Sequence, residues 1–469
     1  MKLRITVSTG ILVLAAGWWL SCACPCLAAG GGKDAVRVSL PRVIEMVVRQ
    51  NRSVVRARNS IQVSRLGLKS AVTDFDLKFR PAAGARLTDE EDGMTAGVSL
   101  TKRFTRGLEL AVSPRVNVNE GDYYSRIGVS LAIPLLKGQG ELVNLAYVRG
   151  EEYSLRTASR SLHRIKTSAI LQAVRSFYDI VSSRHKVELN TFLVARFKKH
   201  ADLAKLKSDI ELASPLDVYR AKIKVKDAEA DLAAAVEALQ KGKHELKTIL
   251  SIPQGSEIAV DEPPIAIAAV DIGVDEAERV ALENRVEILQ AQDALEEARR
   301  YARIAKHNLL PELKLNLDYT RSGESDGFRD SLDLRDERWM VSLSSSSDFA
   351  RSREKLYYQQ MLVNVDSALI DLEDTRERVR QEVRSQLDAL NKIREEIRIR
   401  EQQIHQAEGK KALAAIKFDN DMADNFDLIE AETELHRAKI DLLDARIDYI
   451  VGTYRLREIM GTLLVYHES

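Results

Sequence analysis

The sequence predicts a mainly α-helical fold with a smaller β-barrel part and an internal duplication. Three observations predict it: two very long stretches without proline, alternating strands before each of them, and a likeness between the two halves of the chain. No proline occurs between Gly140 and Asp209, and none follows Pro311. A helix of ~70 residues would span roughly 105 Å, whereas helices in globular proteins average ~10–14 residues.

Composition excludes some classes of protein. The chain has 469 residues, of which 45% are hydrophobic and 30% are charged. This hydrophobic content disfavours intrinsic disorder. The 70 basic and 70 acidic residues balance, whereas a nucleic-acid-binding protein usually carries a net basic surface. We therefore expect no nucleic-acid partner.

The first segment, residues 1–28, has the pattern of a secretory signal peptide: a basic start, an apolar stretch over residues 11–20, and then small residues. We expect cleavage after Ala28. The alternative is acylation at Cys22, although Trp19 stands where lipoprotein signals usually place Leu. An uncleaved anchor is disfavoured because the apolar core is shorter than the ~20 residues that span a bilayer. All three cysteines lie in this segment: Cys22, Cys24 and Cys26.

Two halves of the mature chain resemble each other. Each begins with an amphipathic turn, an Asn-Arg pair (Asn51 and Asn284 with the following Arg) and another helical run. Near their ends "ASPLDVYRA" (213–221) aligns with "ADNFDLIEA" (423–431). A proline-rich linker separates the halves. The predicted domains are a signal peptide (1–28), a first repeat (29–250), a linker (251–273), a second repeat (274–461) and a tail (462–469).

Each half has the same order of elements: helix, strands, very long helix, tight turn, shorter helix. The long helices are expected at about 141–207 and 351–419, and the shorter ones at 215–250 and 426–460. Pro215 suits a first helical turn, and Asp424 and Asn425 suit a helix N-cap. The apolar stripe of each long helix is narrow, so these helices must pack on neighbours. The charges opposite the stripe indicate a solvated coiled-coil face.

Amphipathic strands precede both long helices. Five segments alternate between apolar and polar residues, and a sixth over 79–87 is weaker: 94–101, 108–113, 127–135, 313–320 and 339–344. One apolar and one polar face over ~10 residues is typical of outer-membrane barrels. A half-buried soluble sheet shows the same alternation. Export, polar links and a long predicted loop over 322–338 favour the barrel. The lack of any other stretch that approaches 18 consecutive apolar residues favours it too.

The number of strands predicts an oligomer. Four to six strands cannot close a barrel, because the smallest barrels need ~8. An open edge in lipid leaves backbone groups without hydrogen bonds, at several kcal/mol each. Other copies of the chain are therefore expected to complete the wall.

Catalytic and metal-binding patterns are not found in the sequence. The eight histidines are scattered without metal-ligand spacing, and we expect each to be a surface residue of a helix. No phosphate-binding glycine loop occurs. We therefore predict that the protein is not an enzyme and has no cofactor or metal.

Over nearly all of the mature chain, the sequence resembles the TolC family of outer-membrane efflux and secretion channels. The resemblance rests on the duplication, the Asn-Arg helix starts, "LLPELKLNL", "AIPLLKGQG", and the paired "ASPLDVYRA" and "ADNFDLIEA" turns. It implies a homotrimer in outer-membrane lipid, with a shared barrel above a helical tunnel in the periplasm. It also implies a periplasmic adaptor and an inner-membrane pump, as in multidrug efflux or type I secretion. The competing hypothesis is a soluble periplasmic coiled-coil scaffold.

The resemblance places a gate at the two helix turns, which it also assigns to adaptor docking. Its constricting acidic positions fall on Asp427 and Glu430, which share one helix face and would form stacked rings in a trimer. The alternative is that both only favour a helix N-terminus. The other gate-region positions are Pro215, Asp217, Phe418 and Asp424. The family's latch is altered here: Phe418 lacks a tyrosine hydroxyl, the basic position falls on Ala423, and the acidic partner falls on Lys226.

The first half carries an additional predicted hairpin over residues 94–119. The family pattern is two strands per half. Either the barrel has more than twelve strands, or this hairpin lies outside its wall.

Overall fold

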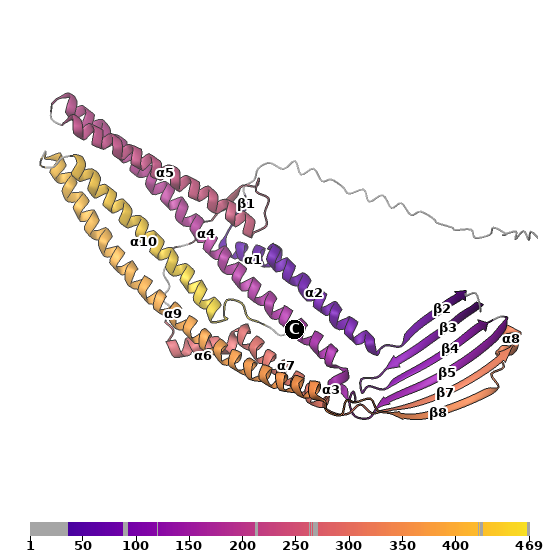
Figure 1. Cartoon of the computed structure of the whole chain (residues 1–469). Coiled ribbons are helices and arrows are strands. Elements are labelled where there is room, and N and C mark those ends of the chain that lie inside the picture. Colours follow the sequence, from indigo (N-terminus) through magenta and orange to yellow (C-terminus); the bar gives the residue numbers. More distant parts are fainter. Residues whose placement is uncertain are drawn as a thin grey trace, which may run out of the picture.

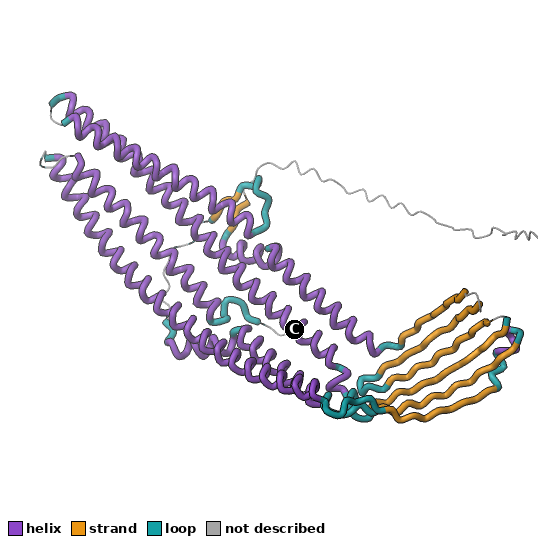
Figure 2. The backbone as a smooth tube through the Cα atoms, in the orientation of Figure 1, coloured by secondary structure: helices purple, strands orange, loops and turns teal. Residues whose placement is uncertain are grey.

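The computed structural model describes residues 36–87, 92–119, 121–211, 214–261, 263, 265, 271–420, 422 and 425–466. The predicted signal peptide with Cys22 and the gate position Asp424 lie outside the described residues. The fold is an elongated helical bundle with a curved sheet at one end, shown in Figures 1 and 2. The predicted fold class, mainly helical with a β-part, is confirmed.

Two long helical hairpins form the shaft of the molecule. The first consists of α4 (Ala146–Asp209) and α5 (Pro215–Ile249), and the second of α9 (Ser352–Asp419) and α10 (Asn425–Ile459). Their turns lie at the end of the molecule opposite the sheet (Figure 1). The observed bounds agree with the predicted helices within about two residues, except that the first long helix begins at Ala146 and not at about 141.

Shorter helices pack beside the shaft near its middle and towards the sheet (Figure 1): α1 (Leu40–Gln50), α2 (Arg52–Val72), α6 (Val274–Asn284) and α7 (Val286–His307). The first Asn-Arg pair has a clear role. The Asn51 side chain accepts hydrogen bonds from the backbone N–H groups of Ser53 and Val54, at 2.9 and 3.3 Å, and caps α2. Its amide also donates to the carbonyl of Ile249 at 2.8 Å, which fixes the start of α2 against the end of α5.

Small elements complete the connections. Strand β1 (Val36–Val38) pairs in parallel with β6 (Ile258–Val260), which lies within the predicted linker. The 3₁₀ turn η1 (Thr73–Phe75) leads from α2 into the sheet, and α3 (Glu141–Asn144) leads out of it.

Six strands form one antiparallel sheet in the order β2-β3-β4-β5-β7-β8. Their bounds are β2 Lys78–Leu87, β3 Asp92–Arg103, β4 Glu109–Asn119, β5 Asp122–Pro134, β7 Lys314–Ser325 and β8 Asp336–Ser344. The predicted long loop over 322–338 is wrong in extent. Strand β7 continues to Ser325, and the short helix α8 (Phe328–Ser331) occupies part of the link.

The apolar stripes predicted for the long helices form two main cores. In the first, Ile170, Val174 and Phe177 of α4 pack with the residues of α1 and α5, and all three are at most 1% exposed. In the second, Val383 and Leu390 of α9 pack against α10 and α6. The second core lies within one half of the chain, whereas the first also includes Ile447 and Ile450 of α10. Burial of apolar area therefore stabilises each hairpin and also joins the two halves.

Helices α9 and α10 approach closely at Gly452. A Cβ atom at this position would lie 2.8 Å from Cδ2 of Leu390, a side chain that is only 1% exposed. The Gln386 amide also donates to the Gly452 carbonyl at 3.0 Å. Glycine at this position therefore permits the close packing of the second hairpin.

We expect Gly452→Ala to destabilise the protein by about 1 kcal/mol or more, because the new methyl group overpacks a filled core. The matched control is Gly409→Ala in α9, where nothing lies within 4 Å of the added Cβ. The control should stabilise the helix by about 0.5–1 kcal/mol. Thermal unfolding of the detergent-solubilised protein measures both. Equal shifts in melting temperature would contradict the packing argument.

Candidate functional site

The candidate site is the end of the shaft where the two helical turns lie (Figure 1). The turns come from equivalent places in the two halves, after α4 and after α9. The two hairpins contact each other next to these turns, where the Lys207 ammonium lies 4.4 Å from the centre of the Phe418 ring. This cation–π contact joins the last turn of α4 to the last turn of α9.

The first turn is built as a capped helix start. Ser214 is the N-cap of α5 and Pro215 is its first residue, an exposed position where proline costs no hydrogen bond. The Asp217 carboxylate accepts from the Ser214 backbone N–H at 3.3 Å, while the Ser214 hydroxyl accepts from the Leu216 N–H at 3.2 Å. Arg220 lies 3.5 Å from the other Asp217 oxygen. Pro215 and Asp217 therefore fix the start of α5. This structural role is enough to explain a proline at the first position and an aspartate at the third.

The altered latch position Lys226 has a local partner. Its ammonium lies 2.8 Å from Glu229 of the same helix, and Lys198 of α4 lies 2.9 Å from the other oxygen of that carboxylate. Hydrogen bonds from Lys226 and Lys198 lower the pKa of Glu229 to about 2. Lys226 thus takes part in holding α5 to α4.

In the second turn, Phe418 is half-buried against a small cluster that contains Ala414, Leu428 and Ala431. The aromatic ring therefore packs between α9 and α10, and Lys207 covers it from α4. Apolar and cation–π contacts therefore hold this ring, which has no hydroxyl group for a hydrogen bond.

Asp427 and Glu430 lie in the first two turns of α10, and both are exposed. Four residues after Glu430 on the same face, Glu434 makes an ion pair of 2.7 Å with Lys410 of α9. The hydrogen bond to Glu434 raises the pKa of Lys410, and the charges of Glu430 and Asp427 add to this effect. The predicted acidic pair is therefore part of a longer acidic strip that Lys410 only partly neutralises.

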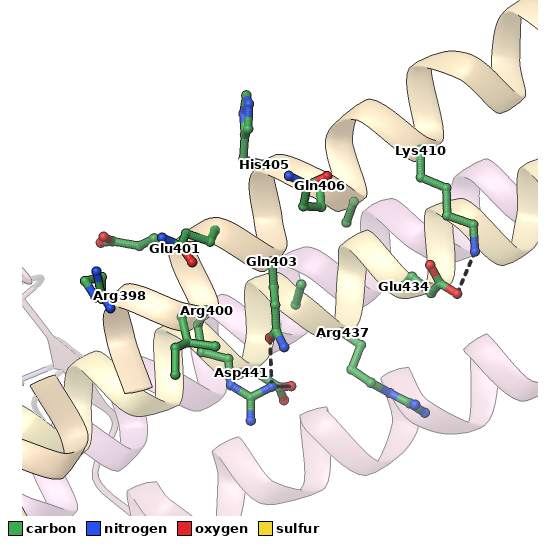
Figure 3. A pocket seen from close by; sticks show the side chains of 14 residues that line it. Arg398, Arg400, Glu401, Gln403, His405, Gln406, Lys410, Glu434, Arg437 and Asp441 are labelled. Atoms are coloured by element: carbon green, nitrogen blue, oxygen red, sulfur yellow. Dashed lines mark hydrogen bonds and ion pairs between the residues drawn. The ribbon is translucent and has the colours of Figure 1, made fainter. Parts of the chain in front are cut away.

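This strip ends at an open groove of about 1230 Å³ between α9 and α10, shown in Figure 3. Ion pairs cross the groove at both ends: Lys410 with Glu434, and Arg400 with Asp441 at 3.0 Å. Charged and amide side chains line most of it, as Figure 3 shows. Such a lining suits a solvated polar surface and not an apolar ligand pocket.

A buried charge cluster ties the two hairpins together beside the tips. Glu432 of α10 is only 5% exposed. One carboxylate oxygen lies 3.1 Å from Arg196 and 3.6 Å from Lys411, and the other lies 3.1 Å from Nε2 of His200. Arg196 and His200 belong to α4, so the cluster joins the first half of the chain to the second. The Asn425 amide adds a hydrogen bond to the His200 carbonyl at 3.0 Å.

The surroundings of Glu432 keep it charged. Burial alone raises the pKa of this carboxyl, but the hydrogen bond and charge of His200, with the charges of Arg196 and Lys411, hold the pKa below its usual value. Further along the contact between α4 and α10, which we call the seam, Lys186 pairs with Asp444 at 2.8 Å and His436 contacts Asn190 at 2.7 Å. A series of polar contacts thus connects α4 to α10 along the hairpins.

The seam was not predicted from the sequence, and it corrects one expectation. His200 is 7% exposed and His436 is half-buried, so neither is a surface histidine. The missed signal is the position of Glu432, which lies between Leu428 and Leu435 on the apolar stripe of α10. A charged side chain on a buried stripe requires a partner of opposite charge or a hydrogen-bond donor.

Within the part of the chain that the structure describes, no group of three or more His, Cys, Asp or Glu residues is placed to hold a metal ion. Among the described helices, none combines the length and the apolar composition needed to cross a membrane.

Known outer-membrane proteins resemble this chain in sequence and in fold. Residues 279–462 match the family model described as outer membrane efflux protein. The outer membrane protein TolC of Vibrio cholerae is 22% identical over 394 residues, which cover 82% of this chain and 86% of TolC. The solved structure of the outer-membrane channel OprN has a TM-score of 0.72 at 16% identity and covers 90% of each chain. The outer membrane protein VceC from V. cholerae has a TM-score of 0.70 at 15% identity, over 90% of this chain and 96% of its own.

Glu432→Gln should loosen the seam between the hairpins, because it removes the charge that Arg196, Lys411 and the ring of His200 contact. Losing one partner of a fully buried ion pair costs ~3–5 kcal/mol. We expect about 2 kcal/mol here, since the Arg196 side chain is 41% exposed and water screens the loss. Faster hydrogen–deuterium exchange at the tips of α4 and α10 measures the effect. The control Glu434→Gln removes only an exposed pair with Lys410, and exchange as fast as in Glu432→Gln would contradict the role of burial.

The seam should also weaken in acid. The pKa of Glu432 is lowered in the folded protein, so its stabilisation is present above the unfolded pKa of ~4.3 and is lost as pH falls through the folded value. Hydrogen exchange at the tips, measured between pH 7 and pH 3, should therefore converge for the wild type and Glu432→Gln at the acidic end. A constant difference across this range would exclude Glu432 as the titrating group.

Proposed function

We propose that this chain, a TolC-like outer membrane efflux protein, is the exit duct of a tripartite efflux pump or a type I secretion system. It conducts substrates passively from the periplasm to the exterior, with its sheet in the outer membrane and its helices in the periplasm. The observation that carries the proposal is an open amphipathic sheet joined to two helical hairpins of up to 68 residues per helix. At 1.5 Å per residue such a helix spans roughly 100 Å of periplasm.

The apolar face of the sheet supports placement in lipid. In the edge strand β8, Trp339, Val341 and Leu343 are 74%, 57% and 63% exposed. Apolar residues on one face of a strand in contact with water favour a partner or a membrane. An acyl-chain environment accommodates all three side chains at once.

The unpaired strand edges and the exposed apolar residues of α9 support a homotrimer. Neither outer edge, of β2 or of β8, has a strand partner among the residues that the structure describes. Along α9, apolar side chains remain exposed at Leu356, Val363 and Ile370. In a closed ring of three copies, strand pairing covers the edges and neighbouring hairpins cover α9.

The tips supply the gate and the docking point for a periplasmic adaptor, through which an inner-membrane pump delivers substrate. Three copies of Asp427 and Glu430 form acidic rings that select for cations at the tunnel entrance. The turns around Pro215, Asp217, Phe418 and Asp424 contact the adaptor. The two repeats, 29–250 and 274–461, each contribute one hairpin to the tunnel, and acylation of Cys22 is the alternative to removal of residues 1–28.

Cell fractionation tests the proposal. We expect a heat-modifiable trimer that is extracted from the outer membrane only with detergent and that restores export in a strain lacking the gene. A monomer released by osmotic shock would contradict the duct and would favour the soluble scaffold.

The acidic pair provides a second test. Asp427→Asn combined with Glu430→Gln should weaken the block of single-channel current by polyvalent cations, about tenfold or more in the blocking concentration, because charge rings bind such cations at the entrance. Conductance in planar bilayers measures the block.

Asp217→Asn is the matched control for this measurement. It removes one carboxylate from the other turn, where the structure assigns the charge to the cap of α5. The block should stay as in the wild type. If the control weakens the block and the double variant does not, the constriction lies at the first turn instead.

A further inference from the structure

We infer that the membrane wall of this protein contains eighteen strands, six from each of three copies, because the additional hairpin β3–β4 is part of the wall. The inference rests on the proposed function for the number of copies and adds the number of strands. The resemblance stated from the sequence implies only twelve. Four lines of observation carry it: the pairing of the strands, their two faces, their open edges and their directions.

The hairpin β3–β4 lies inside the sheet and not beside it. Strand β3 pairs with β2 over the whole of Lys78–Leu87, and β4 pairs with β5 over the whole of Glu109–Asn119. Strands β3 and β4 also pair with each other, so an unbroken order runs from β2 to β8. Moving this hairpin out of the wall would break the ladders on both of its sides.

One face of the sheet is apolar across all six strands, including the hairpin. A row of cross-strand neighbours runs through Phe79, Leu100, Val112, Val129, Tyr319 and Trp339. Leu100 and Val112 come from the additional hairpin and keep the row continuous. A hairpin that lay outside the membrane would not need to match the apolar face of its neighbours.

The opposite face is small or polar in the same register. The corresponding row consists of Ala82, Gly97, Arg115, Arg126, Ser322 and Asp336. Gly97 and Arg115 belong to the additional hairpin. Alternation of an apolar outer face with a polar inner face is typical of a wall between lipid and a water-filled channel, and all six strands obey it.

The two edges fit each other between copies. Every neighbouring pair from β2 to β8 is antiparallel. Because six is an even number, β8 of one copy and β2 of the next run in opposite directions around a closed ring. The edge strands also match in length, with ten residues in β2 and nine in β8. A second copy of this chain is therefore the partner of each edge.

Eighteen strands give a wide wall. With strands ~4.8 Å apart and tilted by about 40°, the backbone diameter is roughly 36 Å, against roughly 24 Å for twelve strands. Barrels of 16–18 strands enclose an aqueous channel. The β-wall then does not restrict the cargo, and the size limit moves to the tips of the helices.

Electron cryo-microscopy of the full chain in lipid nanodiscs counts copies and strands directly. Three copies and eighteen strands are the expected result. Three copies with twelve strands, and the hairpin outside the wall, would overturn this inference and leave the proposed function intact. Two copies with twelve strands would overturn the inference and the trimer. A particle without a membrane-inserted wall would remove the proposed function itself.

Disulfide trapping independently tests the contact between β8 of one copy and β2 of the next. Ala82→Cys in β2 is combined in separate variants with Arg338→Cys, Met340→Cys or Ser342→Cys in β8, all on the polar face. Mild oxidation should produce covalent dimers and trimers for at least one combination. The control pairs Ala82→Cys with Ser130→Cys, which lies on the same face in the interior strand β5 and should not link subunits. Covalent dimers without trimers, or equal linkage in the control, would contradict the pairing of β8 with β2 of the next copy.

Discussion

The unpaired backbone edges of β2 and β8 are the constraint on which the other features of this structure depend. In lipid, each N–H and C=O group without a partner costs several kcal/mol, so the sheet requires closure. Closure by identical copies imposes rotational symmetry about an axis through the wall. In the proposed trimer, the helices attached to each sheet surround the same axis, so that two hairpins per chain form a continuous tunnel.

The long helices are stable because each one packs along its length, and not because of helix propensity alone. Each stripe covers only part of the helix surface. In α9, Val383 and Leu390 are buried while Leu362, Val363 and Ile370 remain exposed. Within one copy, therefore, the hairpins are complete as pairs but incomplete as a layer. The same chain supplies the partner for the buried stripe, and in the proposed trimer the neighbouring copies supply the partner for the exposed one.

Local rules predicted the elements better than they predicted the contacts between them. The absence of proline and the alternation of residues were enough to place α4, α9 and six strands, because both signals act along a single segment. The extent of the link after β7 was wrong, since α8 and the ends of two strands occupy a region whose polar residues suggested a loop. The Glu432 cluster could not be found in this way. Its partners Arg196 and His200 lie more than 230 residues away in the sequence, and only the packing of α4 on α10 brings them together.

The first turns of α10 separate two roles of acidic residues by helix geometry. Glu432 faces α4, where a buried carboxylate must be neutralised, and it contacts Arg196, Lys411 and the ring of His200. Asp427 and Glu430 lie on the exposed side of the same helix, where their charge acts on the solvent. Only two residues separate Glu430 from Glu432, which is a rotation of about 200° at 3.6 residues per turn. Charge at position 432 therefore acts on the contact between the hairpins, whereas in the proposed duct charge at 427 and 430 acts on the entrance. A change of charge at that entrance then leaves intact the seam that holds the hairpins together.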